Sequence, residues 1–192
     1  AELEVNVPKG HVIAVNTSTQ KGTTKTSVEE AEFKAGFGIL GDAHAGDWHR
    51  QVSLLDDHSV ERMRQKGVKG LNPGIFAENI TTSGLLLEQF PLGTRISIGN
   101  VLLEVTQIGK ECHAHCAIFK QVGSCVMPLE GIFTRVLQGG TVRAGDEIRV
   151  EIPIRVAVLT LSDKAAAGLR EDRSGPALAE VLSRTAEVLE VK

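Results

Sequence analysis

The chain has 192 residues, of which 42% are apolar and 23% charged, and its formal net charge is −3. This length allows one well-buried domain, or one domain and part of a second, and the ordinary composition argues against intrinsic disorder. The negative charge argues against general nucleic-acid binding, and no apolar run approaches the roughly 20 residues of a membrane helix.

Twenty glycines and few helix-length periodic stretches predict many short strands in the first three quarters of the chain. Val12–Asn16 and Gln51–Leu55 are expected strands. A helix is expected to follow, capped by Asp56 or Asp57 and running through about Lys66.

The clearest strand signal is Thr94–Val105, where apolar residues alternate on either side of Gly99-Asn100 and predict a hairpin. Met127–Leu137 is expected to be a short helix that begins near Pro128, and Glu147–Ile152 a strand. Because strands dominate and turn signals recur, a β-barrel or sandwich is expected.

The pattern changes at Pro153. Ile154–Leu161 is a near-continuous apolar run, as in strands buried in a parallel sheet, and Ser174 is expected to cap a following helix. Val188–Val191 suggests the start of another strand. The apolar stripe assigned to this helix comprises Leu178, Val181, Leu182 and Leu189.

One strand and one helix cannot complete a parallel sheet. The tail is therefore expected to dock on the barrel, to pair with another copy, or to be loosely held. Its unpaired strand edge favours a homodimer.

Two of the three cysteines and two of the six histidines fall within Cys112–Cys116. Lys110, His113 and His115 would favour the thiolate form of Cys112, because nearby cations stabilise the anion. A zinc staple, a Cys112–Cys116 disulfide and a sulfur-handling nucleophile are all compatible with the spacing. No structural metal is expected, since no second Cys/His pair is evident.

Two other segments carry polar side chains. In Gly38–Arg50, the side chains of His44, His49 and Arg50 could bind an anion, or the segment is a solvated surface loop. In Asn72–Ile80, Glu78-Asn79 offers a carboxylate and an amide, although Asn79 would serve equally well to tie down the loop.

The order of these segments resembles the MOSC domain, found at the C-terminus of eukaryotic molybdenum-cofactor sulfurases and as small bacterial proteins. The resemblance covers about residues 8 to 151. It rests on six segments in order: Gly38-Ile-Leu-Gly-Asp-Ala-His44, Arg50-Gln-Val-Ser-Leu54, Pro73-Gly-x-Phe-x-Glu-Asn-Ile80, Leu92-Gly-Thr-Arg-x-x-Ile-Gly99, Gly109-Lys-x-Cys-x₃-Cys116 and Cys125-x-x-Pro-x-Glu-Gly-Ile-Phe-x-Arg-Val136.

The resemblance implies a mostly β, MOSC-type barrel with a few short helices over residues 1–152, and an essential cysteine at Cys112. That cysteine would carry sulfur as a persulfide or bind the molybdenum of the cofactor. Other residues implied in binding molybdopterin, the molybdenum cofactor, are Arg50, His44 and Lys110 for its phosphate, Asn79 and Glu130 for the pterin, and Arg135, paired with Glu130 or with the ligand.

Residues 153–192 resemble the start of MogA/MoaB-type molybdopterin-binding domains, through Leu161-Ser-Asp-Lys164 and Glu171-Asp-x-Ser-Gly-Pro176. They would form a β-loop-α fragment of an α/β domain. The family's downstream Gly-Gly-Thr-Gly segment and acidic catalytic residues are absent from these residues, so adenylylation of molybdopterin is not expected.

The leading hypothesis is a protein of molybdenum-cofactor metabolism that binds the cofactor, either firmly or transiently, and carries or transfers sulfur through Cys112. The alternative is a molybdopterin carrier or chaperone, or a molybdenum-cofactor oxidoreductase component, with Cys112 as a molybdenum ligand. Cys116 would resolve the persulfide or pack, whereas packing is favoured for Cys125.

The expected partners are a cysteine desulfurase as sulfur donor and a molybdoenzyme or molybdopterin as acceptor, with neither nucleic acid nor membrane. The acidic first residues lack the order of a signal peptide, and an odd number of cysteines suits a reducing compartment, so a cytoplasmic location is expected.

Overall fold

The computed structural model describes residues 8–111, 119–120, 123, 125–153, 155–161, 167–169, 171–183 and 186–191. The chain divides into two compact units, and the boundary between them in the sequence falls between Ile152 and Pro153. The strands of the first unit are β1 (Lys9–Thr17), β2 (Thr26–Val28), β3 (Glu30–Lys34), β4 (Gly38–Ile39), β5 (Val52–Asp56), β6 (Ile80–Ser83), β7 (Arg95–Ile98), β8 (Val101–Ile108), β9 (Ile132–Gln138), β10 (Gly140–Arg143) and β11 (Glu147–Glu151). Its helical segments are α1 (Asp57–Gln65), the 3-10 turn η1 (Leu87–Gln89) and α3 (Met127–Glu130). The second unit contains β12 (Arg155–Val158), α5 (Ser174–Leu182) and β13 (Glu187–Val191).

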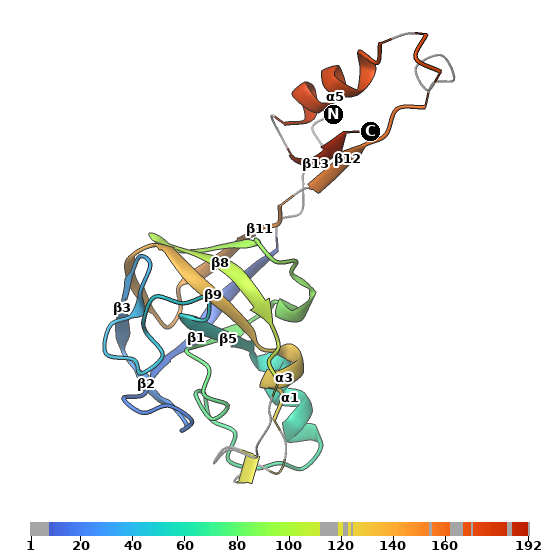
Figure 1. Ribbon diagram of the computed structural model, residues 1–192. Coiled ribbons are helices and arrows are strands. Elements are labelled where there is room, and N and C mark those ends of the chain that lie inside the picture. The colour runs from blue at the N-terminus through green and yellow to red at the C-terminus, as the bar shows by residue number, and fades with distance from the viewer. Residues whose placement is uncertain are drawn as a thin grey trace. The chain divides into compact units, whose positions relative to one another are not determined.

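The first unit is a closed β-barrel, which Figure 1 shows. Seven strands pair in the order β11-β7-β8-β9-β5-β6-β1, and β1 pairs again with β11 to close the ring. Neighbours in this ring are antiparallel except β5 and β6, which are parallel. Closure leaves the ring strands without open edges. The expected mostly β barrel with a few short helices is confirmed.

Alternating apolar residues fill the inside of the barrel. In the β7–β8 hairpin, the side chains of Ile96, Ile98, Leu103 and Val105 are buried in the main apolar cluster. Gly99 begins the turn with φ +54°, a left-handed conformation that glycine adopts without strain. The hairpin predicted from the sequence is therefore confirmed.

A second apolar cluster lies where α1 and α3 stand side by side at one end of the barrel (Figure 1). Asp56 caps α1, because its Oδ1 accepts a hydrogen bond from the His58 N–H at 3.0 Å. Arg62 of α1 forms an ion pair with Glu130 of α3. The predicted strand–cap–helix sequence is confirmed, and the second cluster consists of Leu55, Val60, Met63, Leu71, Phe76, Val126, Met127 and Phe133.

The helix predicted over Met127–Leu137 is wrong beyond its first turn. The helix α3 ends at Glu130, and the chain continues as strand β9 between β8 and β5. In β9 the buried side chains of Ile132, Thr134 and Val136 follow a period of two. Pairing with a strand on each side therefore overrides the helical spacing of the apolar residues.

The second unit is a β-α-β arrangement in which β12 and β13 pair in parallel. The strand suggested at Val188–Val191 is confirmed. The predicted cap is wrong: Ser174 is already helical, and the Asp172 carboxylate accepts the Ser174 N–H at 2.9 Å and the Gly175 N–H at 3.3 Å. A carboxylate suits a helix N-terminus, because it satisfies unpaired N–H groups there.

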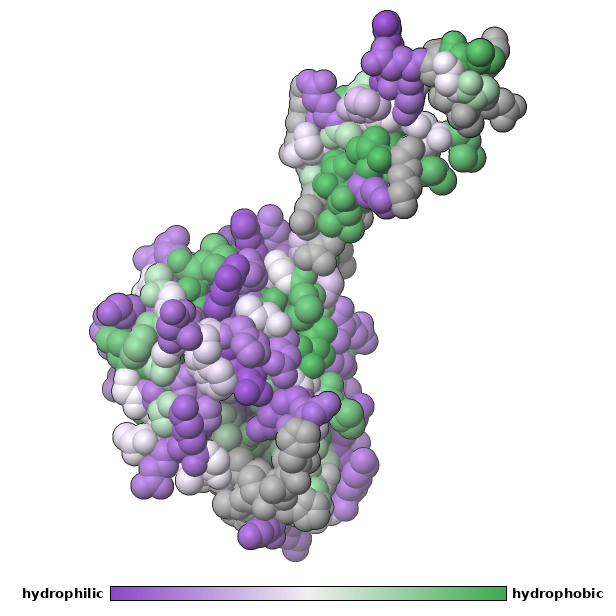
Figure 2. All heavy atoms as spheres, viewed as in Figure 1, coloured by the Kyte–Doolittle hydropathy of each residue, from purple (hydrophilic) through white to green (hydrophobic). Residues whose placement is uncertain are grey.

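The stripe predicted for α5 is not a buried face within its unit. Leu178 is 51% exposed and Val181 61% exposed, while Leu189 lies in β13 rather than in the helix. Figure 2 shows apolar residues on the visible face of this unit. In the part of the chain that the structure describes, no helix is both long and apolar enough to cross a membrane.

Candidate functional site

The first unit contains a pocket with a volume of about 240 Å³. Four of the residues expected to bind a ligand line it, namely His44, Arg50, Asn79 and Lys110. The pocket therefore gathers residues from three separate segments of the sequence. Its other lining residues are Lys21, Trp48, Ser53, Phe76, Ala77, Met127 and Phe133.

Arg50 is a charged residue of this pocket whose side chain stacks on two aromatic rings. Its guanidinium lies over the Trp48 ring, 4.9 Å from the centroid, and over the Phe133 ring at 5.6 Å. Its Nε is buried and has no hydrogen-bond partner among the described residues. A buried guanidinium N–H normally has an acceptor. Arg50 is therefore suited to bind an anionic group in the pocket.

The loop that presents Arg50 is held by the next residue. The Gln51 amide donates to the Gly46 carbonyl at 3.1 Å, and its carbonyl oxygen accepts the Val136 N–H of β9 at 2.8 Å. Arg50 is thus fixed beside Phe133, which lies in the same strand as Val136.

Three more basic residues surround the pocket, and no carboxylate is among its described lining residues. The Lys21 ammonium lies 5.6 Å from the Trp48 ring centroid, on which Arg50 also stacks. Lys110 is held by its backbone N–H, which donates to the Pro128 carbonyl of α3 at 3.2 Å. With His44, these residues give the pocket a basic lining that favours anions.

Asn79 joins the wall of the pocket to the barrel. Its Oδ1 accepts the Ser53 N–H of β5 at 3.1 Å, and its Nδ2 donates to the Asn16 carbonyl of β1 at 3.1 Å. The oxygen and the nitrogen of the amide therefore both hold the loop in place. This is the second of the two roles that the sequence left open for Asn79. Ala77 beside it has φ +64°, an uncommon left-handed conformation for a residue other than glycine.

Glu78 is fully buried behind this wall. Its carboxylate accepts hydrogen bonds from the Gly74 N–H at 2.6 Å, the Phe76 N–H at 3.1 Å and the Thr81 hydroxyl at 2.8 Å. Burial raises the pKa of Glu78, and these hydrogen bonds oppose the rise. The carboxylate holds the loop around Gly74 rather than facing the pocket.

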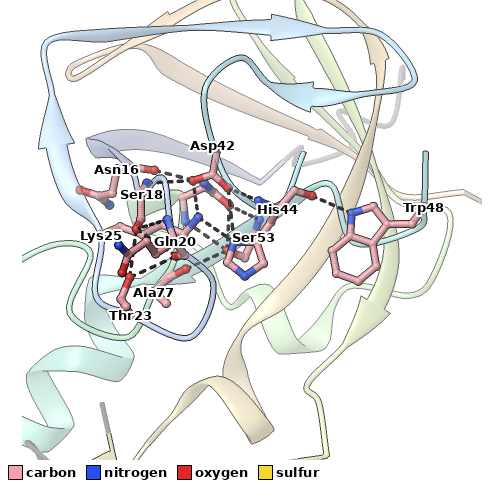
Figure 3. A network of polar contacts seen from close by, with 11 residues as sticks. Asn16, Ser18, Gln20, Thr23, Lys25, Asp42, His44, Trp48, Ser53 and Ala77 are labelled. Atoms are coloured by element: carbon pink, nitrogen blue, oxygen red, sulfur yellow. Dashed lines mark hydrogen bonds and ion pairs between the residues drawn. The ribbon is translucent and has the colours of Figure 1, made fainter. Parts of the chain in front are cut away.

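A buried ion pair lies next to His44, as Figure 3 shows. The Lys25 ammonium is 2.5 Å from Asp42 Oδ2, and both side chains are almost fully buried. Lys25 Nζ is also 3.3 Å from His44 Nδ1. Burial would raise the pKa of Asp42, but hydrogen bonds from His44 and Lys25 outweigh it and hold that pKa well below its usual range.

Glu130 and Arg135 are not among the residues that line the pocket. Glu130 pairs with Arg62, and Arg135 pairs with Glu104 at 2.8 Å. Glu104 and Arg135 are register partners on β8 and β9, which explains why they pair with each other. The expected roles of Glu130 and Arg135 toward a ligand gain no support from this placement.

Cys112 and Cys116 lie outside the described residues. Cys125 is half-buried and packs against the second apolar cluster. Among the described residues, no group of three or more His, Cys, Asp or Glu side chains could hold a metal ion.

The sequence reading missed the aromatic walls and the ion pair. Trp48, the only tryptophan, stands two residues before Arg50, which could have suggested a stacking partner. Phe133 was assigned to a helix, so its place beside Arg50 could not be foreseen. Lys25 and Asp42 are 17 residues apart and gave no paired signal.

A family model described as the MOSC domain matches residues 41–149. No match was found among the curated protein sequences.

Three solved structures share the fold. The YUAD protein from Bacillus subtilis has a TM-score of 0.66 at 20% identity, covering 76% of this chain and 97% of its own. YiiM from Escherichia coli has a TM-score of 0.54 at 20% identity, covering 95% and 86%. YiiM from Geobacillus stearothermophilus has a TM-score of 0.56 at 19% identity, covering 94% of each chain.

Proposed function

Because this chain belongs to the MOSC domain family, we propose that it acts in molybdenum-cofactor metabolism. It binds molybdopterin or the molybdenum cofactor in the pocket around Arg50 and carries sulfur as a persulfide on Cys112. The observation that carries the binding part is the stacked Arg50 guanidinium, whose buried Nε has no partner among the described residues.

The residues present fit such a ligand. Molybdopterin combines a flat pterin ring with a phosphate, and when its metal is bound it supplies a molybdenum atom that can accept a sulfur ligand. Arg50 and Lys110 would hold the phosphate through charge-assisted hydrogen bonds. Trp48 and Phe133 supply apolar surface for the ring, as most small-molecule sites do.

Sulfur transfer depends on Cys112, which follows Lys110 by two positions. Lys110 lines the pocket. The Cys112 thiolate attacks the outer sulfur of a persulfide on a cysteine desulfurase. The donor's S–S bond breaks, its inner sulfur leaves as a thiolate, and the new S–S bond forms on Cys112. Atoms and charge balance without a further oxidant or reductant.

The binding part is tested by titrating molybdopterin into wild type and Arg50→Met. We expect at least a tenfold weaker affinity for Arg50→Met, because a charge-assisted contact contributes about 1.5–3 kcal/mol. Arg143→Met is the matched control, since Arg143 is exposed on β10 and pairs with Glu30. Equal affinities in all three proteins would contradict the assignment of Arg50.

The second candidate is a carrier or oxidoreductase component in which Cys112 binds molybdenum and no sulfur moves. The same pocket favours it, because cofactor binding is common to both functions. Persulfide formation on Cys112 separates them, since only the sulfur carrier requires it.

The second unit is proposed to be the start of a MogA/MoaB-type domain. Its parallel β12 and β13, with α5 between them in sequence, are consistent with the opening of an α/β fold. No catalytic role is assigned to it.

A further inference from the structure

The buried Lys25–Asp42 pair contacts His44, which lines the pocket. Neither Lys25 nor Asp42 lines the pocket, whereas His44 does. Their side chains are 1% and 0% exposed. Burying an ion pair costs desolvation that an apolar pair of similar size avoids.

The position of His44 is fixed on several sides. Its backbone N–H donates to Asp42 Oδ1 at 2.9 Å, and its carbonyl accepts the Trp48 indole N–H at 2.7 Å. Figure 3 shows these contacts around the histidine. These two contacts fix the backbone of His44, and its ring lies with Nδ1 3.3 Å from Lys25 Nζ.

Two groups compete for Nδ1 of His44. Lys25 Nζ lies at 3.3 Å with hydrogen-bond geometry, and Asp42 Oδ1 lies at 3.4 Å but already accepts the His44 backbone N–H. An ammonium can only donate hydrogen bonds. If Lys25 bonds to Nδ1, that nitrogen must be the bare acceptor, and the ring hydrogen must be on Nε2.

We propose that Lys25 and Asp42 are positioning residues that hold His44 as a neutral imidazole with its hydrogen on Nε2. Asp42 keeps Lys25 charged in a buried place, and Lys25 in turn occupies Nδ1. Nε2–H is then left to donate to an anionic oxygen of the pocket's ligand. The tautomer is independent of the proposed function, while the donor role rests on it.

In this arrangement, different residues of the pocket supply the positive charge and the uncharged hydrogen-bond donor. Arg50 and Lys110 supply charge, and His44 supplies a directed, uncharged donor, so the ligand must present an acceptor oxygen at that point. Without Lys25, the Asp42 carboxylate would be left unpaired and would take Nδ1–H as its partner. The donor toward the pocket would then depend on a second ring proton.

The tautomer is tested by ¹H–¹⁵N NMR of the imidazole rings in the full chain, with His44→Gln used to assign the His44 signals. In wild type we expect Nε2 to carry the hydrogen and Nδ1 to be bare. In Lys25→Met, which keeps an unbranched side chain only one atom shorter and removes the charge, we expect Nδ1 to gain a hydrogen.

A hydrogen on Nδ1 in wild type overturns the proposal, and so does a folded Lys25→Met protein with the wild-type pattern. A pair that only stabilised the fold would leave the His44 signals unchanged. If Lys25→Met does not fold, the wild-type pattern alone decides.

Inorganic phosphate, titrated into wild type, tests the donor role. A shift of the His44 Nε2 proton together with the Arg50 side-chain signals supports it, whereas a shift of the Arg50 signals alone overturns it. If phosphate shifts neither, the anion-binding part of the proposed function fails, and the tautomer is judged on the spectra without phosphate.

Discussion

Asp42 is the residue whose removal should have a large and pH-dependent effect on stability. Asp42→Asn leaves the buried Lys25 ammonium without its counter-charge, which should lower the free energy of unfolding by about 3–5 kcal/mol near neutral pH. Urea unfolding of both proteins measures this difference.

The sign of the pH dependence follows from the lowered pKa of Asp42. The ionised carboxylate stabilises the folded chain above the unfolded pKa of 3.8, and this contribution is lost as pH falls through the folded pKa. The difference between wild type and Asp42→Asn should therefore narrow below about pH 3.8. A difference that stays constant into strong acid would contradict the role of this ion pair.

For single residues, the residue type predicted which side chains could bind an anion better than it predicted which side chains they contact. Anion binding by His44 and Arg50 could be proposed from basic side chains among glycines, and both line the pocket. Trp48 and Phe133 were missed as partners of Arg50, because the contact forms only when the loop before β5 meets β9. The charged side chains could be recognised in the sequence, but the aromatic rings that pack against Arg50 could not.

Among the elements, the loop between α1 and β6 offers a matched pair of glycines. Gly70 and Gly74 both have positive φ, so alanine costs about 1–2 kcal/mol at either position. A Cβ on Gly70 would meet no atom within 4 Å, but on Gly74 it would lie 2.4 Å from the Lys25 carbonyl oxygen.

Gly74→Ala should therefore destabilise the protein by about 1–3 kcal/mol more than Gly70→Ala. It should also disturb Lys25, whose backbone N–H donates to the Gly74 carbonyl at 2.8 Å. Thermal unfolding of the two variants measures the difference. Equal losses of stability in the two variants would contradict the close approach, because the loop would then shift at Gly74 without cost.

Elements with local signals could be predicted, and the element set by distant pairing could not. The β7–β8 hairpin and the cap of α1 depend on neighbouring residues, and both are present as expected. The stretch after Gly131 has the apolar spacing of a helix. It nevertheless forms β9, because strands far away in the sequence supply its hydrogen bonds.

For the whole molecule, the barrel should function without the second unit. The described pocket residues all belong to the first unit. For comparison, 76% of this chain matches 97% of the YUAD protein. A chain shortened to residues 1–152 should fold and bind molybdopterin with an affinity within about threefold of the full chain, because it keeps every described residue that lines the pocket. Calorimetric titration checks this, and loss of binding in a folded shortened chain would show that the second unit contributes to the site.

The most direct test of the proposed function is the intact mass of the protein after incubation with a cysteine desulfurase and cysteine. Wild type and Cys125→Ala should each gain the mass of one sulfur, which a reductant removes, whereas Cys112→Ala should gain none. A gain that persists in Cys112→Ala, or no gain in any of the three proteins, would contradict sulfur carriage through Cys112.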